Sequence, residues 1–241
     1  VSTEAPQITG LTHGLSGRPS HWASNDNYIF AYEAESLPEQ LRKRNRENGK
    51  DTVIYRVRLS DITAPLGTKA ELLSENVSDT SDIVPDTVAN DGAASLRAEY
   101  LTQNLGRVSI DFYRCTESLY NNTETPDQSE LTMNDVTKHI VLIFEAQNVD
   151  GSNDHVYAQF EYILDAVSYQ YYQLTGTLPT YNLIGHSRGG ITNLQYALAH
   201  PYNVASLYSM GTPYNGSAFG GVVDGSGYRR FLEIAEMYRN Y

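Results

Sequence analysis

A glycine-flanked serine turn constrains the fold of this chain more than any other stretch. Residues Leu183–Gly190 read LIGHSRGG, and they continue a short apolar run, Tyr181–Ile184, that predicts a strand. A helical pattern begins near Gly190. This is the G-x-S-x-G pattern in the strand, turn and helix context of a nucleophile elbow. The sequence therefore predicts a strand that delivers Ser187 to the edge of a sheet.

The residue types around Ser187 suit nucleophilic catalysis. A serine hydroxyl becomes an effective nucleophile only when a base takes its proton and donors hold the developing oxyanion. The turn is expected to point the backbone N–H of Arg188 at that oxyanion. Gly185 and Gly189 fit because the strand and the helix approach so closely that a Cβ atom would clash. The alternative interpretation is a glycine turn without chemistry.

A second turn of the same kind lies near the start of the chain. Ile8–Thr12 predicts a short strand, and His13, Gly14 and Leu15 follow it. Gly14 allows a sharp turn that exposes the Leu15 N–H, which would be the second oxyanion donor if the turn lies beside the elbow. The alternative is a simple glycine-rich loop. His13 is interpreted as a structural histidine that braces the loop, not as a base.

Strand and helix patterns alternate along most of the chain. A capping box over Ser36–Glu39, with Glu39 reaching back to Ser36, opens a predicted helix over 37–48. Strands are expected over 52–59, 138–145 and 204–210, and helices over 153–174 and from about 190 to 199. The apolar run in 138–145 predicts a strand covered on both faces. This order predicts an α/β domain with a mostly parallel sheet flanked by helices.

Residues 60–137 are read as an insertion into a single domain that spans 1–241. The segment is rich in Ser, Thr, Asp and Asn. It contains a helical pattern over 93–105 and a strand pattern over 107–115, and 116–135 reads as loop. A hairpin, a cap and part of a cleft wall all remain open interpretations.

Composition excludes several classes of protein. The net charge of −12 argues against a nucleic-acid binder, which needs a basic face. No apolar run approaches the ~20 residues of a membrane span, so no transmembrane segment is expected. The one cysteine, Cys115, excludes an internal disulfide and a cysteine-rich metal site. No methionine begins the sequence, so we expect that a leader was removed and that the protein is secreted or extracytoplasmic.

Three motifs occur in one order along the chain: THGLSG (Thr12–Gly17), NLIGHSRGG (Asn182–Gly190) and SMGTPYNGS (Ser209–Ser217). Together they resemble the α/β-hydrolase fold lipases, especially the bacterial triacylglycerol lipases, over roughly residues 8–59 and 138–220. The resemblance implies an α/β-hydrolase fold, a lid that begins at about 218–241, and a lipid or ester substrate. It also implies Ser187 as nucleophile and Leu15 and Arg188 as backbone oxyanion donors, with Gly14, Gly185 and Gly189 supporting the site.

One feature departs from that family, which places its acid and histidine after the nucleophile. The one histidine after Ser187 is His200, which a helix of ~1.5 Å rise per residue puts ~20 Å away. The triad acid and histidine are therefore not expected in this chain, because the later acids lie where the lid begins: Asp224, Glu233 and Glu236. The fold is then incomplete at its C-terminus, and a cleaved part or a second polypeptide completes it. The third explanation is a recruited upstream histidine: His21, His139 or His155.

The predicted function is a serine-dependent carboxylic ester hydrolase, a lipase acting on acylglycerols through an acyl-enzyme on Ser187. No cofactor and no metal site are expected in this chain. Calcium sites occur in some members of the family, and by resemblance their ligands would lie beyond residue 241. The alternatives are an acyltransferase or peptidase on the same fold, and a non-catalytic hydrolase-fold binding module.

Overall fold

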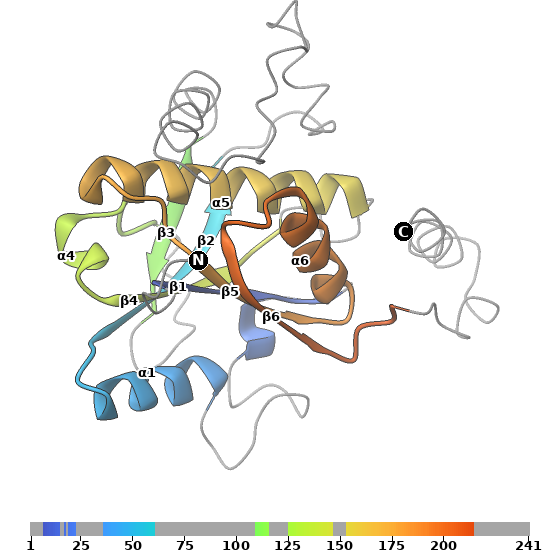
Figure 1. The fold of residues 1–241 in the computed structure, drawn as a ribbon, viewed down its shortest axis with the longest axis horizontal. Coiled ribbons are helices and arrows are strands. Elements are labelled where there is room, and N and C mark those ends of the chain that lie inside the picture. The colour runs from blue at the N-terminus through green and yellow to red at the C-terminus, as the bar shows by residue number, and fades with distance from the viewer. Residues whose placement is uncertain are drawn as a thin grey trace, which may run out of the picture.

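A six-stranded sheet forms the centre of the molecule. The computed structural model describes residues 7–14, 17, 19–22, 36–60, 109–115, 125–146 and 153–214. Within these ranges the strands lie in the order β3-β2-β4-β1-β5-β6 (Figure 1). They are β1 (Ile8–Thr12), β2 (Thr52–Leu59), β3 (Ile110–Arg114), β4 (His139–Phe144), β5 (Tyr181–His186) and β6 (Val204–Met210).

The sheet is parallel except at one edge. β2, β4, β1, β5 and β6 pair in parallel, and β3 pairs antiparallel with β2. The helices are η1 (Pro19–Trp22), α1 (Leu37–Glu47), α4 (Met133–Val136), α5 (Asn153–Thr175) and α6 (Arg188–Ala199). The prediction of a mostly parallel sheet flanked by helices is confirmed for the described residues.

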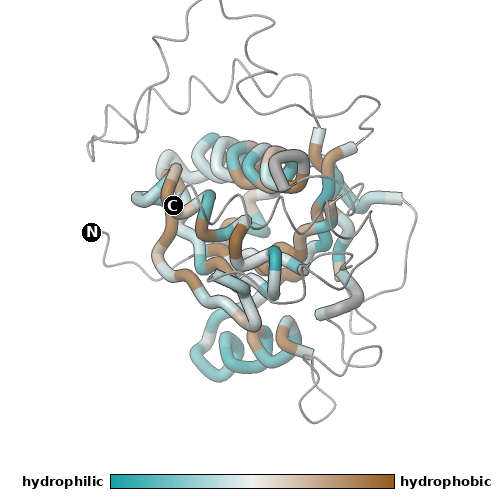
Figure 2. Tube along the Cα trace, turned by 90° about the vertical axis from the view of Figure 1, so that its right-hand side faces the viewer, coloured by the Kyte–Doolittle hydropathy of each residue, from teal (hydrophilic) through white to brown (hydrophobic). Residues whose placement is uncertain are grey.

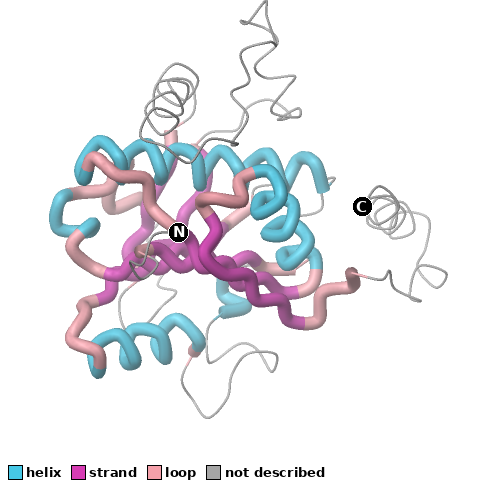
Figure 3. The backbone as a smooth tube through the Cα atoms, in the orientation of Figure 1, coloured by secondary structure: helices cyan, strands magenta, loops and turns pink. Residues whose placement is uncertain are grey.

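Helices cover both faces of the sheet, as Figures 1 and 3 show. α5 and α6 lie on one face, and α1 and η1 lie on the other, where Trp22 is fully buried. Figure 2 shows that α1 is largely hydrophilic, so it contributes only a narrow apolar side. All six residues of β4 are buried, which agrees with the expected strand covered on both faces.

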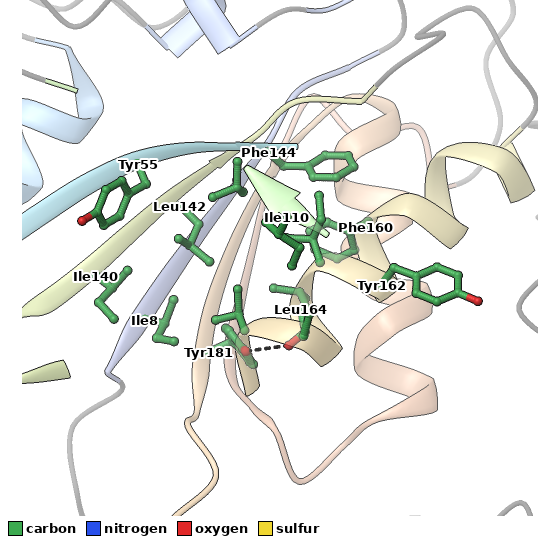
Figure 4. Close-up of a cluster of buried hydrophobic side chains, with 14 of the residues drawn as sticks. Ile8, Tyr55, Ile110, Ile140, Leu142, Phe144, Phe160, Tyr162, Leu164 and Tyr181 are labelled. Carbon is green, nitrogen blue, oxygen red and sulfur yellow. Dashed lines mark hydrogen bonds between the residues drawn. The ribbon is translucent and has the colours of Figure 1, made fainter. Parts of the chain in front are cut away.

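The larger core lies between the sheet and α5 (Figure 4). Tyr181, at the start of β5, is fully buried, and its hydroxyl donates to the Leu164 carbonyl at 3.0 Å. The Ser168 hydroxyl lies 2.7 Å from the Tyr181 hydroxyl oxygen. Because a buried hydroxyl without partners costs free energy, these bonds fix the start of β5 against α5. The opposite end of β5 carries the serine turn.

The segment read as an insertion contributes to the sheet itself. β3 lies within it, and Ser60 donates its N–H to the Ser109 carbonyl at 3.0 Å. The end of β2 and the start of β3 therefore lie side by side. The expected loop over 116–135 is wrong in part, because α4 begins at Met133 with a capping box between Thr132 and Asp135. A single helical turn is too short for periodicity to reveal.

Two local predictions need correction. Ser36 caps α1 as expected, but the Glu39 carboxylate pairs with Arg42 at 2.8 Å, so the reach back to Ser36 is not observed. α6 begins at Arg188, two residues before the expected start. The predicted helix over 93–105 and the lid over 218–241 lie outside the described residues. No helix in the described ranges is both long and apolar enough to cross a membrane.

Candidate active site

The serine turn has a strained backbone. Ser187 follows β5 directly and has φ 52° and ψ −122°, and it is the one non-glycine residue with positive φ in the described ranges. It is the N-cap of α6, a position that serine favours for its hydroxyl. Here the side chain makes no capping hydrogen bond, and the Ser187 N–H donates to the Met210 carbonyl at 2.9 Å. Such an outlier, held by its surroundings, supports a functional hypothesis.

The glycines of the turn leave no room for a side chain. A Cβ atom on Gly185 would lie 2.5 Å from the Gly190 nitrogen, and one on Gly189 would lie 2.2 Å from the Thr12 carbonyl oxygen. A Cβ atom on Gly190 would lie 1.9 Å from the Thr212 hydroxyl. These contacts, not backbone freedom, explain why glycine flanks the serine. The elbow therefore packs closely against the end of β1 and the loop after β6, and its strand packs closely against the start of α6.

The turn after β1 lies directly against the elbow. A Cβ atom on Gly14 would lie 2.9 Å from the Ser187 Cβ and 3.1 Å from Nδ1 of His186. His13 is buried, with its Nδ1 3.0 Å from the Gly14 carbonyl oxygen and its ring stacked on Phe144. This contact holds the imidazole against the loop, and the bracing role of His13 stays a prediction. Leu15, the expected donor, lies outside the described residues.

The other expected donor lies at the N-terminus of α6. Arg188 is the first residue of this helix and is 2% exposed. The first N–H groups of a helix point out of its N-terminus, and the helix dipole favours negative charge there. The position of Arg188 is therefore suited to hold an oxyanion next to the Ser187 side chain.

The structure separates two histidines from Ser187. His139 begins β4, and its Nε2 lies 2.9 Å from the Thr9 hydroxyl. Thr12, three residues further along β1, pairs with Gly185, so His139 lies at least ~10 Å from the elbow. Recruitment of His139 as the base is therefore excluded. Burial, together with the Lys50 charge, lowers the pKa of His139 to about 4.

His200 is also remote from the elbow. It caps the C-terminal end of α6, and its Nε2 lies 2.8 Å from the Glu161 carboxylate of α5. The side chains of His21 and His155 lie outside the described residues. Among the described residues, no group of three or more His, Cys, Asp or Glu side chains gathers in a way that could hold a metal ion.

One polar contact at the elbow was not predicted from the sequence. The fully buried Asn193, in the second turn of α6, lies 2.7 Å from the Thr12 hydroxyl at the end of β1. The two residues are 181 positions apart in the chain. A polar residue on the buried side of an apolar helix is the one hint that could have indicated Asn193.

The loop after β6 lies against the start of α6. Gly211 has φ 58°, and the Tyr214 hydroxyl donates to the Gly190 carbonyl at 3.4 Å and bonds the Ser209 hydroxyl. The G-T-P-Y motif therefore closes one side of the elbow.

Part of the chain matches curated proteins, among them a triacylglycerol lipase of Pseudarthrobacter phenanthrenivorans and a triacylglycerol lipase of Burkholderia plantarii, each 33% identical over 92 residues. The match covers 38% of this chain, and it covers 27% and 24% of the two lipases. The chain thus spans about a quarter of the length of the relatives it matches. No family model matches the chain, and no solved structure matches it. These findings support a relationship to lipases.

Proposed function

We propose that this chain carries the nucleophile of a serine-dependent carboxylic ester hydrolase of the α/β-hydrolase fold, which acts on lipid esters such as acylglycerols. Ser187 is the nucleophile, and the N–H groups of Leu15 and Arg188 hold the oxyanion. The observation that carries the proposal is the backbone of Ser187, which is strained, lies at the N-terminus of α6, and holds a hydroxyl that makes no capping bond.

Two further observations support the same chemistry. Gly14 lies so close to the elbow that a Cβ atom on it would be 2.9 Å from the Ser187 Cβ, which favours an oxyanion donor directly after Gly14. The partial similarity to two proteins named triacylglycerol lipase favours a lipid ester as substrate.

The proposed reaction proceeds through an acyl-enzyme. A histidine outside the described residues takes the Ser187 hydroxyl proton as the oxygen attacks the ester carbonyl carbon. The carbonyl oxygen becomes an oxyanion, which the two N–H donors stabilise. The intermediate expels the alcohol, which takes the proton from the histidine. Water, deprotonated by the same histidine, then releases the acid and restores Ser187. This sequence of bonds needs no cofactor.

The test is ester hydrolysis by the intact protein with Ser187→Ala. Removal of a nucleophile typically costs several powers of ten in rate, so hydrolysis of p-nitrophenyl butyrate should fall by at least about 10³-fold. Ser168→Ala is the matched control, since it removes a buried serine hydroxyl of α5. That hydroxyl contacts Tyr181, at the end of β5 remote from Ser187. This variant should keep the wild-type kcat. An unchanged rate in Ser187→Ala would contradict the assignment.

The products distinguish the remaining chemistries. p-Nitrophenyl esters of increasing acyl length, with and without an alcohol acceptor, separate hydrolysis from acyl transfer, and a long-chain optimum supports a lipase. A fluorophosphonate probe should label the wild-type protein at Ser187. An intact, folded protein that neither reacts with the probe nor hydrolyses esters would be a binding module instead.

A further inference from the structure

The buried amide of Asn193 joins three backbone segments around the candidate site. Its side chain extends from α6 to the Thr12 hydroxyl, 2.7 Å away in β1. With the amide nitrogen facing Thr12, that nitrogen also donates to the Gly189 carbonyl at 3.3 Å. In the same orientation the amide oxygen accepts from the Gly185 N–H at 3.2 Å. One side chain thus bonds β1, the end of β5 and the first turn of α6.

These three segments are the ones on which the proposed oxyanion donors depend. Thr12 is the last residue of β1 and lies two residues before Gly14, which precedes Leu15 in the sequence. Gly185 and Gly189 lie on either side of Ser187 and Arg188. The two donors thus belong to separate strand ends, and sheet pairing stops where the turns begin. At that boundary the Asn193 amide hydrogen-bonds the end of β1 to the end of β5.

A buried amide at this position costs free energy unless its polar atoms form hydrogen bonds. Asn193 and Thr12 are 0% and 1% exposed, and an apolar residue would fill the same space without polar groups to satisfy. In the orientation described, the amide nitrogen and the amide oxygen both have partners. Close packing adds to the restraint, because a Cβ atom on Gly189 would lie only 2.2 Å from the Thr12 carbonyl oxygen. The junction is therefore fixed in position as well as buried.

We propose that Asn193, together with Thr12, is a positioning residue that sets the distance between the turn after β1 and the elbow, and so the spacing of the two oxyanion donors. This role rests on the proposed esterase function. Oxyanion donors act through their placement relative to the transition state, so a looser junction lowers kcat and leaves substrate binding unchanged. A misplacement of about 1 Å costs up to ~100-fold in rate.

The experiment compares two threonines of β1 in the intact protein. Thr12→Val removes the hydroxyl that meets Asn193 and keeps the shape of the side chain. Thr9→Val removes an equally buried hydroxyl of the same strand, which bonds His139 far from the elbow. Hydrolysis of p-nitrophenyl butyrate gives kcat and KM, and thermal denaturation gives the stability. We expect Thr12→Val to lower kcat by about tenfold with KM within about twofold of wild type.

The controls separate positioning from stability. Thr12→Ser retains the hydroxyl and should restore kcat, and Thr9→Val should lower the melting temperature without a change in kcat. If Thr12→Val fails to fold, Asn193→Ser is measured instead, because serine is too short to reach all three partners. A wild-type kcat in the folded variant, or equal kcat losses at Thr9 and Thr12, overturns the positioning role. Full activity in Ser187→Ala overturns the proposed function itself, and the positioning role with it.

Discussion

The strained backbone at Ser187 predicts that two variants without the nucleophile will differ in stability. Ser187→Ala and Ser187→Gly both remove the hydroxyl. Alanine retains a Cβ atom and therefore the strain of φ 52° and ψ −122°. Glycine adopts positive φ values without a steric penalty. We expect Ser187→Gly to be the more stable of the two.

The size of the difference follows from two opposing terms. A non-glycine residue in a sparsely populated backbone region costs about 1–3 kcal/mol. Glycine loses more backbone entropy on folding, which costs about 0.5–1 kcal/mol. The net advantage of Ser187→Gly over Ser187→Ala is therefore about 1 kcal/mol. For a chain of 241 residues this corresponds to roughly 2–4 °C in melting temperature.

Thermal denaturation of the intact variants, backed by urea titration, measures the difference. Ala197→Gly in α6 is the matched control, since glycine in a regular helix costs up to about 1 kcal/mol. Glycine in place of alanine should then raise the stability at position 187, in the helix cap, and lower it at position 197, inside the helix. A Ser187→Gly variant that is no more stable than Ser187→Ala would refute the strain, and with it the observation that carries the proposed function.

Two further predictions test the surroundings of the elbow and the pH response of the fold. Gly14→Ala places a methyl group 2.9 Å from the Ser187 Cβ, so we expect kcat for ester hydrolysis to fall by about 100-fold and stability by about 1–3 kcal/mol. An Ala variant with wild-type kinetics would show that the turn is not held against the nucleophile. His139 has a folded pKa of about 4 against an ordinary value of 6.5, so the unfolded chain binds its proton first as the pH falls. With respect to His139, the free energy of unfolding is therefore highest above pH 6.5. It decreases by about 3 kcal/mol as the pH falls from 6.5 to 4, and it changes no further below pH 4. His139→Gln should flatten this part of a urea-denaturation series against pH, and an unchanged slope would assign the effect to other groups.

The sequence was sufficient to predict elements that have strong apolar patterns and clear ends. β1, β2 and β6 begin and end where expected, and α5 stops at Gly176, which has φ 74°. The start of α6 was missed because Gly189 and Gly190 are typical of a turn. They belong to the first turn of α6 instead. Glycine is needed there because Cβ atoms on these residues would clash with Thr12 and Thr212.

The candidate site was predictable to the extent that it is local. The elbow is a run of consecutive residues, so its strand, turn and helix could be recognised from spacing alone. The contact of Asn193 with Thr12 could not, because it joins residues 181 positions apart and depends on the register of β1 with β5. The Glu39 side chain shows a similar limit, since Arg42 competes for the carboxylate expected to reach Ser36.

The place of β1 in the sheet has a consequence for biosynthesis. This strand is hydrogen-bonded on one side to β4 and on the other to β5. Its contact between Thr9 and His139 spans 130 residues. A ribosome that adds about 5–20 residues per second leaves β1 without a neighbour for on the order of ten seconds. During that time the backbone N–H and C=O groups of β1 have no strand to pair with, and pairing over such a distance is slow. We therefore expect β1 to join the sheet only after β4 is made.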